Sequence, residues 1–149
     1  MKILLYQPDI AGNVGTIMRM AVCFDLELNI IEPCGFPFDE DKILKRSAMD
    51  YIKSVKLKRY SSFEEFKEHN KDCRIVLLTT QSLIPYYEFN FNENDVLMVG
   101  RESAGVPDEI HNAVNNRLLI PMKNGARCLN VAISLSIVVG EALRQCKLY

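Results

Sequence analysis

Short apolar runs of strand length, each followed by a segment with helical periodicity, are the feature that most constrains the fold of this chain. Three of them, KILLY at 2–6, RIVLLT at 74–79 and DVLMV at 95–99, are almost continuously apolar. A strand that is apolar on both faces is typical of a parallel sheet covered by helices on either side. The alternation therefore predicts an α/β fold, with a parallel sheet and helices on both of its faces.

The remaining elements follow from the same periodicities and from capping signals. Ser62 and Glu65 have the spacing of a capping box, and Pro107 suits the first turn of a helix. We predict strands at 2–6, 28–32, 54–60, 74–79, 95–99 and 117–120. We predict helices at about 13–24, 41–47, 62–69, 107–114 and 129–146.

Length and composition restrict the class of protein. The 149 residues suffice for one substantial core, so we expect residues 1–149 to form a single domain. No apolar run reaches the roughly 18 residues that cross a bilayer, and the first apolar run predicts a strand rather than a signal peptide. We therefore expect a cytoplasmic protein that is not inserted in a membrane. The five cysteines are widely spaced, without a C-x-x-C or Cys/His pattern, which argues against a metal site and against disulfides.

Charge gives an ambiguous signal about nucleic acid. The formal net charge is −1, whereas nucleic-acid binders usually carry a basic footprint. Positive charge gathers between Lys42 and Arg59, where seven basic residues stand against one acid, Asp50. Taken by itself, this stretch is either a solvated surface or part of an RNA interface.

Ligands of parallel α/β sheets bind beyond the carboxyl ends of the strands. The sequence therefore points to three loops, which follow Leu78, Val99 and Ile120. Gly100 and Gly105 allow a tight path past a ligand, but their spacing fits neither a dinucleotide fingerprint nor a Walker loop. A nicotinamide or nucleoside-triphosphate enzyme is therefore disfavoured.

Two helix starts add polar candidates to these loops. The segment from Asn13 to Arg19 combines a glycine, a helix start and a planar cation. Asn130 suits the N-cap of the last helix. His69 and His111 fall in no motif, and we expect both to be structural or solvated.

The order and spacing of several motifs make the chain resemble a known family. They are YQPDIAGNVGTIMR, IIEPCGFPFD, DYI, LTT, VGRESAGVP, IPM and RCLNVAISLSIVVGEALRQ. Together they are similar to the SPOUT superfamily of RNA methyltransferases, and specifically to its TrmL branch. The resemblance implies a C-terminal deep trefoil knot, although true knots are almost absent from proteins. It also implies S-adenosyl-L-methionine as cofactor, tRNA as partner and an obligate homodimer.

The resemblance further implies roles for single residues. Leu78, Gly100, Ile120 and Cys128 would contact the cofactor, largely through backbone groups. Arg19 would help the ribose 2′-hydroxyl to react, with Asn13 and Asn130 positioning it. As substrate contacts we select Glu102, Arg101, Lys45 and Arg46. The chain departs from the family pattern at Cys128, where serine is usual, at Arg101, where proline is frequent, and at Gly140, where the best-known relatives have tyrosine.

The expected activity is 2′-O-methylation of the wobble cytidine or modified uridine of leucine tRNAs. One alternative is a 2′-O-methyltransferase for another tRNA or ribosomal RNA ribose. A second is an RNA-binding module of the same fold without catalysis. The presence of Asn13, Arg19 and Asn130 favours an enzyme.

Overall fold

The computed structural model describes residues 1–46, 55–125 and 128–148. Its strands are β1 (Lys2–Tyr6), β2 (Glu27–Ile31), β3 (Leu57–Tyr60), β4 (Arg74–Leu78), β5 (Asp95–Val99) and β6 (Asn116–Leu118). Its α-helices are α1 (Ala11–Cys23), α2 (Glu40–Arg46), α3 (Phe63–His69), α4 (Asp108–Ala113) and α5 (Val131–Cys146), with a 3-10 turn η1 at Tyr86–Glu88. The strands form one sheet in the order β3-β2-β1-β5-β4-β6, and each neighbouring pair is parallel.

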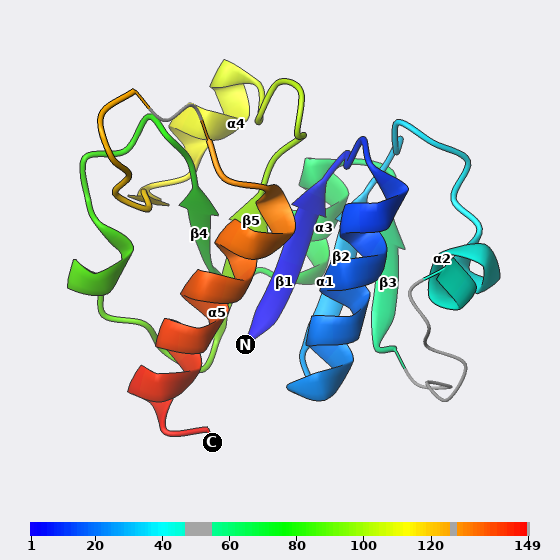
Figure 1. The fold of residues 1–149 in the computed structure, drawn as a ribbon, viewed down its shortest axis with the longest axis horizontal. Coiled ribbons are helices and arrows are strands. Elements are labelled where there is room, and N and C mark those ends of the chain that lie inside the picture. The colour runs from blue at the N-terminus through cyan, green and yellow to red at the C-terminus, as the bar shows by residue number, and fades with distance from the viewer. Residues whose placement is uncertain (47–54, 126–127, 149) are drawn as a thin grey trace.

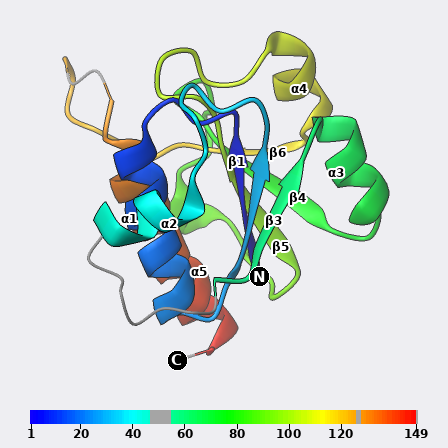
Figure 2. The ribbon, with the colours of Figure 1, turned by 90° about the vertical axis from the view of Figure 1, so that its right-hand side faces the viewer.

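Alternating side chains of the central strands supply the cores on the two faces of the sheet. In β1, Ile3 and Leu5 pack into the core that α1, α2 and α5 cover, whereas Leu4 and Tyr6 pack against α3 and α4. Figure 2 shows the two helical layers on opposite sides of the sheet, with the strands between them (Figure 1 gives the labels). The predicted α/β architecture, a parallel sheet with helices on both faces, is confirmed.

Most element boundaries agree with the prediction, and one difference lies at the carboxyl ends of the strands. The last strand was expected at 117–120 but ends at Leu118. Leu119 turns away from β4 because its backbone pairs with the β4–β5 connection instead. Its N–H donates to the carbonyl of Ile84, and its carbonyl accepts from the N–H of Tyr86, both at 2.9 Å. The DYI motif at 50–52 lies outside the described residues.

The starts of α1 and α5 also differ from the prediction. Helix α1 begins at Ala11 instead of 13, so Asn13 lies in its first turn and its side chain is not used as a cap. Helix α5 begins at Val131 rather than 129 because Asn130 is its N-cap. The Asn130 side chain accepts from the backbone N–H groups of Ala132, at 2.9 Å, and Ile133, at 3.3 Å.

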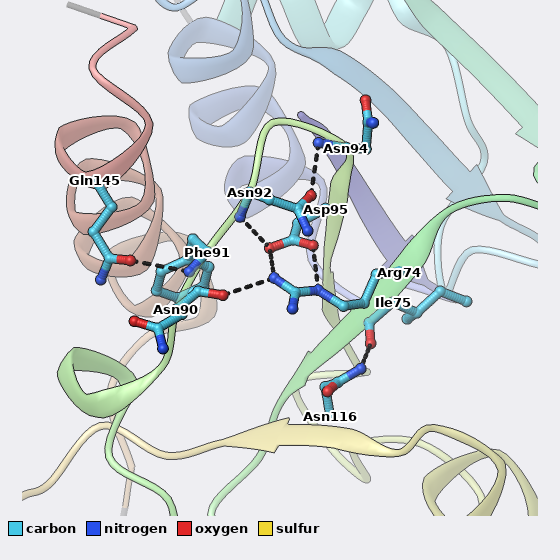
Figure 3. A network of polar contacts seen from close by, with 9 residues as sticks. All are labelled: Arg74, Ile75, Asn90, Phe91, Asn92, Asn94, Asp95, Asn116 and Gln145. Atoms are coloured by element: carbon cyan, nitrogen blue, oxygen red, sulfur yellow. Dashed lines mark hydrogen bonds and ion pairs between the residues drawn. The ribbon is translucent and has the colours of Figure 1, made fainter.

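A buried ion pair fixes the amino ends of β4 and β5 (Figure 3). The Arg74 guanidinium donates from Nε and Nη2 to the two carboxylate oxygens of Asp95, each at 2.7 Å. The Asp95 side chain is completely buried, whereas that of Arg74 is 36% exposed. Nearby, Gln145 of α5 accepts from the N–H of Phe91 at 2.9 Å and donates to the carbonyl of Phe89 at 3.0 Å. The connection that leads into β5 is thereby tied to the last helix.

Candidate active site

A cavity of about 470 Å³ lies at the carboxyl ends of β4, β5 and β6. The three loops that the sequence singled out form its walls. Leu78, Gly100, Ile120 and Cys128, the residues expected to contact a cofactor, all line it. Asn13, Asn130, Arg101 and Glu102 line the same cavity, so most of the predicted site residues are brought together.

The loop after β5 needs its two glycines for different reasons. A Cβ at Gly100 would lie 2.4 Å from the carbonyl carbon of Gly105, so any larger residue would push the loop apart. Gly105 has a φ of +67°, which L side chains rarely adopt. Arg101 and Gly105 exchange backbone hydrogen bonds of 2.9 Å across this narrow turn. The sequence therefore produces a tight loop whose backbone approaches the cavity closely.

Three polar side chains from distant parts of the chain form a directed hydrogen-bond network. Asn130 donates from Nδ2 to Asn13 Oδ1 at 2.9 Å, and Asn13 donates from Nδ2 to Glu102 Oε1 at 2.8 Å. The second Glu102 oxygen accepts from the N–H of Asp9 at 2.8 Å. Because Glu102 only accepts when ionised, the orientation of both asparagine amides is determined. The network fastens α1, the loop after β5 and the start of α5 to one another.

A second clamp joins the segment before α1 to the loop after β5. Asp9 accepts from the Ser103 hydroxyl at 2.5 Å and from the Ser103 N–H at 3.1 Å. These bonds, the side-chain one first, stabilise the carboxylate and lower the pKa of Asp9 below its usual value. Sequence reasoning missed this clamp because Asp9 and Ser103 are 94 residues apart and match no short motif.

Arg101 lies in the cavity wall and is hydrogen-bonded to a residue that was not among the predicted site residues. Its Nη2 donates to Oε1 of Gln7, the residue after β1. Gln7 has a φ of +45°, and its own Nε2 donates to the carbonyl of Glu32 at 3.0 Å. His111, expected to be structural or solvated, also lines the cavity, and its Nδ1 lies 3.2 Å from Nη1 of Arg117.

Arg19 lies apart from the other predicted catalytic residues. It belongs to the exposed surface of α1, and it is not among the described residues that line the cavity. At about 100° per residue, six residues place it roughly 120° around the helix axis from Asn13. The fold of one chain therefore does not bring Arg19 into the cavity beside Asn13.

Much of the basic stretch between Lys42 and Arg59 is neutralised by nearby carboxylates. Lys42 pairs with Asp39 at 3.1 Å, Lys56 with Asp25 at 2.6 Å and Lys58 with Glu27 at 2.8 Å, while Arg59 pairs with Glu32. Lys45 and Arg46 belong to α2, but their side chains lie outside the described part of the chain. The pairing of β2 with β3 explains the neutralisation on β3, because it sets Lys58 near Glu27 of β2 and Arg59 near Glu32, the residue after β2.

The cysteines occupy different environments. Cys128 is exposed in the cavity wall, and Cys23 is exposed on α1. Burial raises the pKa of Cys34 to about 11, so its thiol stays protonated at neutral pH.

Among the described helices, none combines the length and apolar character that a bilayer crossing requires.

Comparisons with known proteins found related sequences and structures. A model of the SpoU rRNA Methylase family matches residues 1–140. A tRNA (cytidine(34)-2'-O)-methyltransferase from Ancylobacter novellus is 44% identical over 147 residues, covering 97% of this chain and 92% of that protein. One from Beijerinckia indica is 46% identical, covering 95% of this chain and 89% of its own length. A solved structure described as giving insights into the 2-OH methylation of C/U34 on tRNA superposes with a TM-score of 0.89 at 34% identity, covering 97% and 94% of the two chains.

Proposed function

Because the chain belongs to the SpoU rRNA methylase family, we propose that it is an S-adenosylmethionine-dependent tRNA 2′-O-ribose methyltransferase. The likeness to proteins named for methylation of cytidine 34, over 97% and 95% of this chain, is the observation that carries the proposal. The wobble nucleotide of tRNA is therefore the substrate that we assign, with leucine tRNAs as the isoacceptors. We expect residues 1–149 to act as a single domain in the cytoplasm.

The cavity fits the cofactor in size and in the character of its walls. Sites for small molecules usually measure about 300–1,000 Å³, and this one measures about 470 Å³. Gly100 leaves the close approach that a Cβ would fill. We propose that Leu78, Gly100, Ile120 and Cys128 hold S-adenosylmethionine, chiefly through their backbone N–H and C=O groups. When bound, the cofactor supplies a methyl group activated by a sulfonium.

The side chains of the protein then have to orient and activate the ribose. In our proposal Asn13 and Asn130 hold the reacting groups at the cavity, and Glu102 keeps the loop after β5 against α1. Arg19 stabilises the oxyanion that develops on the 2′-oxygen, or it binds the adjacent phosphate, because a guanidinium keeps its proton at neutral pH and cannot act as the base. The proton leaves through solvent or phosphate.

A homodimer would explain why Arg19 lies outside the cavity of its own chain. A second copy could present its Arg19 and help to position RNA. Helix α5 has apolar side chains on its surface, with Ile133 54% exposed and Ile137, one turn further on, 36% exposed. We propose that these side chains are covered in the dimer. Sedimentation of I133E should show a monomer where the native chain sediments as a dimer, and a native monomer at micromolar concentration would contradict the proposal.

The connection between β4 and β5 supports the proposed trefoil knot. It is bonded to Leu119 just after β6, through Ile84 and Tyr86, and to Gln145 of α5, through Phe89 and Phe91. The same connection is thus fastened to the chain both before and after the loop that contains Cys128. We propose that the chain from 119 onward threads through it, which gives the deep C-terminal trefoil knot of the family.

The activity is tested by incubating the protein with labelled S-adenosylmethionine and total tRNA, followed by mapping of the methylated nucleosides. We expect 2′-O-methylcytidine and 2′-O-methylated modified uridine at position 34 of leucine tRNAs. A labelled methyl group on another tRNA ribose or on ribosomal RNA would show that this other ribose is the substrate. Cofactor binding without methylated RNA would favour a binding module of the same fold.

Residue roles are tested separately from the overall activity. R19A should abolish methyl transfer while S-adenosylhomocysteine still binds with its native affinity in calorimetry. K45Q and R46Q, which remove predicted RNA contacts, should raise the KM for tRNA and leave cofactor affinity unchanged. A fully active R19A variant would overturn the role assigned to this arginine.

A further inference from the structure

Seven of the described lysines and arginines are paired with carboxylates. They are Lys2, Lys42, Lys56, Lys58, Arg59, Arg74 and Arg144. Arg101, in the cavity wall, is instead held by the neutral amide of Gln7. Within the described part of the chain, no carboxylate forms an ion pair with Arg101. Its guanidinium is therefore oriented without being neutralised.

Gln7 is adapted to this holding role. Its φ of +45° lies in the left-handed region, which is unfavourable for a residue with a Cβ. Three hydrogen bonds maintain that conformation: the Gln7 N–H donates to Ile31 at 2.9 Å, its Nε2 donates to Glu32 at 3.0 Å, and its Oε1 accepts from Arg101. Both ends of the side-chain amide are used, so the oxygen has to face the arginine.

Arg101 also retains unused hydrogen-bonding capacity. Its Nε is buried and has no acceptor among the described residues. The Asp9 carboxylate is near enough for Arg101 to contribute to its lowered pKa, but Asp9 accepts two hydrogen bonds from Ser103. A planar guanidinium whose charge no carboxylate neutralises is well suited to a phosphate or a carboxylate.

We propose that Arg101, positioned by Gln7, binds a phosphodiester of the RNA next to the ribose that is methylated. This inference rests on the proposed function. Glu102, the next residue, bonds to Asn13 in the network where the ribose is to be held. In RNA the 2′-hydroxyl and the 3′-phosphodiester are on adjacent ribose carbons, so a ribose at this network brings a phosphate with it. The carboxylate of the cofactor is the competing anion, and the experiment separates the two.

The experiment measures the salt dependence of equilibrium tRNA binding together with the affinity for S-adenosylhomocysteine. Each neutralised phosphate contributes roughly 0.7 to 0.9 to the slope of log K against log salt. R101Q should lower the slope by about that amount and weaken tRNA binding roughly tenfold at low salt. R101K should keep the slope, because it keeps the charge, while still weakening binding. Affinity for S-adenosylhomocysteine should stay within about twofold of native in both variants.

Gln7 is tested as a positioning residue. Q7G removes the side-chain amide but suits the left-handed backbone, so the relief of backbone strain should offset part of the lost hydrogen bonding and the variant should still fold. Its KM for tRNA should rise while kcat and the salt slope stay close to native, because the arginine keeps its charge but not its orientation. An unchanged KM for Q7G would remove Gln7 from the proposal.

The control is R144Q, which makes the same change of charge at a cation paired with Glu141, at the end of α5 opposite to Asn130. It should leave the slope and the KM unchanged. A native slope in R101Q, or a loss of S-adenosylhomocysteine affinity in that variant, would overturn the assignment to RNA. If the native protein binds tRNA with the expected slopes but transfers no methyl group, only the proposed function fails.

Discussion

Asn130 shows how one side chain can serve both the fold and the site. The side-chain oxygen of Asn130 accepts from the backbone N–H groups of Ala132 and Ile133 in the first turn of α5. Its side-chain nitrogen donates to Oδ1 of Asn13. The cap is a requirement of any helix start, whereas the bond to Asn13 belongs to the cavity. A substitution that keeps one role and removes the other can therefore distinguish them.

N130D should separate these roles. Aspartate caps as well as asparagine and is favoured at a helix N-terminus, so the unfolding free energy should stay close to native. The new carboxylate cannot donate to Asn13 Oδ1, and the Asn13 amide nitrogen is already directed at Glu102. We expect kcat to fall roughly tenfold or more. N130A should lose activity and also about 1 kcal/mol of stability in urea unfolding. Native turnover by N130D would show that the asparagine acts only as a cap.

Thiol labelling tests the location of Cys128. Because Cys128 lines the cavity, S-adenosylhomocysteine should protect it from iodoacetamide, whereas exposed Cys23 should react equally fast with and without ligand. Cys34 should react slowly at pH 8, since a pKa of about 11 leaves roughly one thiol in a thousand ionised. The labelling rate of Cys34 should rise steadily as the pH approaches 11. Mass spectrometry of the labelled peptides measures all three rates, and equal labelling of Cys128 in both conditions would exclude contact with the ligand.

Single residues also show what sequence could and could not predict about the site. Gly100, Asn130 and the three loops were predictable because strand ends, glycine turns and helix caps depend on neighbours in sequence. Gln7 was not, because its role depends on Arg101, 94 residues away. The family resemblance supplied Asn13 as a site residue, but its bonds to Glu102 and Asn130 required the structure.

At the scale of elements, strand ends are determined by whichever partner offers backbone hydrogen bonds. The apolar run 117–120 suggested a strand through Ile120, yet β6 ends at Leu118 because Leu119 pairs with Ile84 and Tyr86. Similarly, β3 was expected from 54 but begins at Leu57, where β2 starts to provide a parallel partner through Leu28. Periodicity predicts that a strand exists, whereas its limits depend on the neighbouring strand.

The amino ends of β4 and β5 offer a test of the buried ion pair. D95A leaves the Arg74 guanidinium without the carboxylate that receives two of its hydrogen bonds, and it also removes the acceptor of the Asn92 N–H. The Arg74 side chain is 36% exposed and can be partly solvated, so the cost should lie below that of a fully buried pair, at about 2 kcal/mol. We expect D95A to lose about that much unfolding free energy in urea. D95N, which keeps the shape and one acceptor but not the charge, should lose less; equal losses would show that the charge, rather than the shape or the remaining acceptor, stabilises this contact.

At the scale of the whole molecule, alternation of elements predicted the class of fold but not the strand order. The order β3-β2-β1-β5-β4-β6 puts the first strand at the centre and brings β6 to the edge beside β4. The pattern of apolar residues along a strand cannot reveal which parallel strands are neighbours, because every central strand is apolar on both faces. The final helix returns to pack against α1 and β5 (Figure 1).

The position of α5 predicts how a shortened chain should behave. Residues 1–129 contain Asn13 and Glu102 but lack Asn130 and α5, which packs over the core through Leu135, Val138 and Val139. We expect that fragment to bind no S-adenosylhomocysteine in calorimetry. A chain ending at 146, with α5 complete, should bind it with native affinity. Binding by the shorter fragment would show that the cavity forms without the last helix.

The bond between Asn13 and Asn130 joins side chains 117 positions apart. During translation the first of them leaves the ribosome long before the second has been made. A nascent chain therefore holds only one partner of this hydrogen bond until residue 130 has been made and has left the ribosome. This contact between α1 and α5 can form only after the last helix has folded against the sheet, so the cavity is completed late in folding, whichever element folds first.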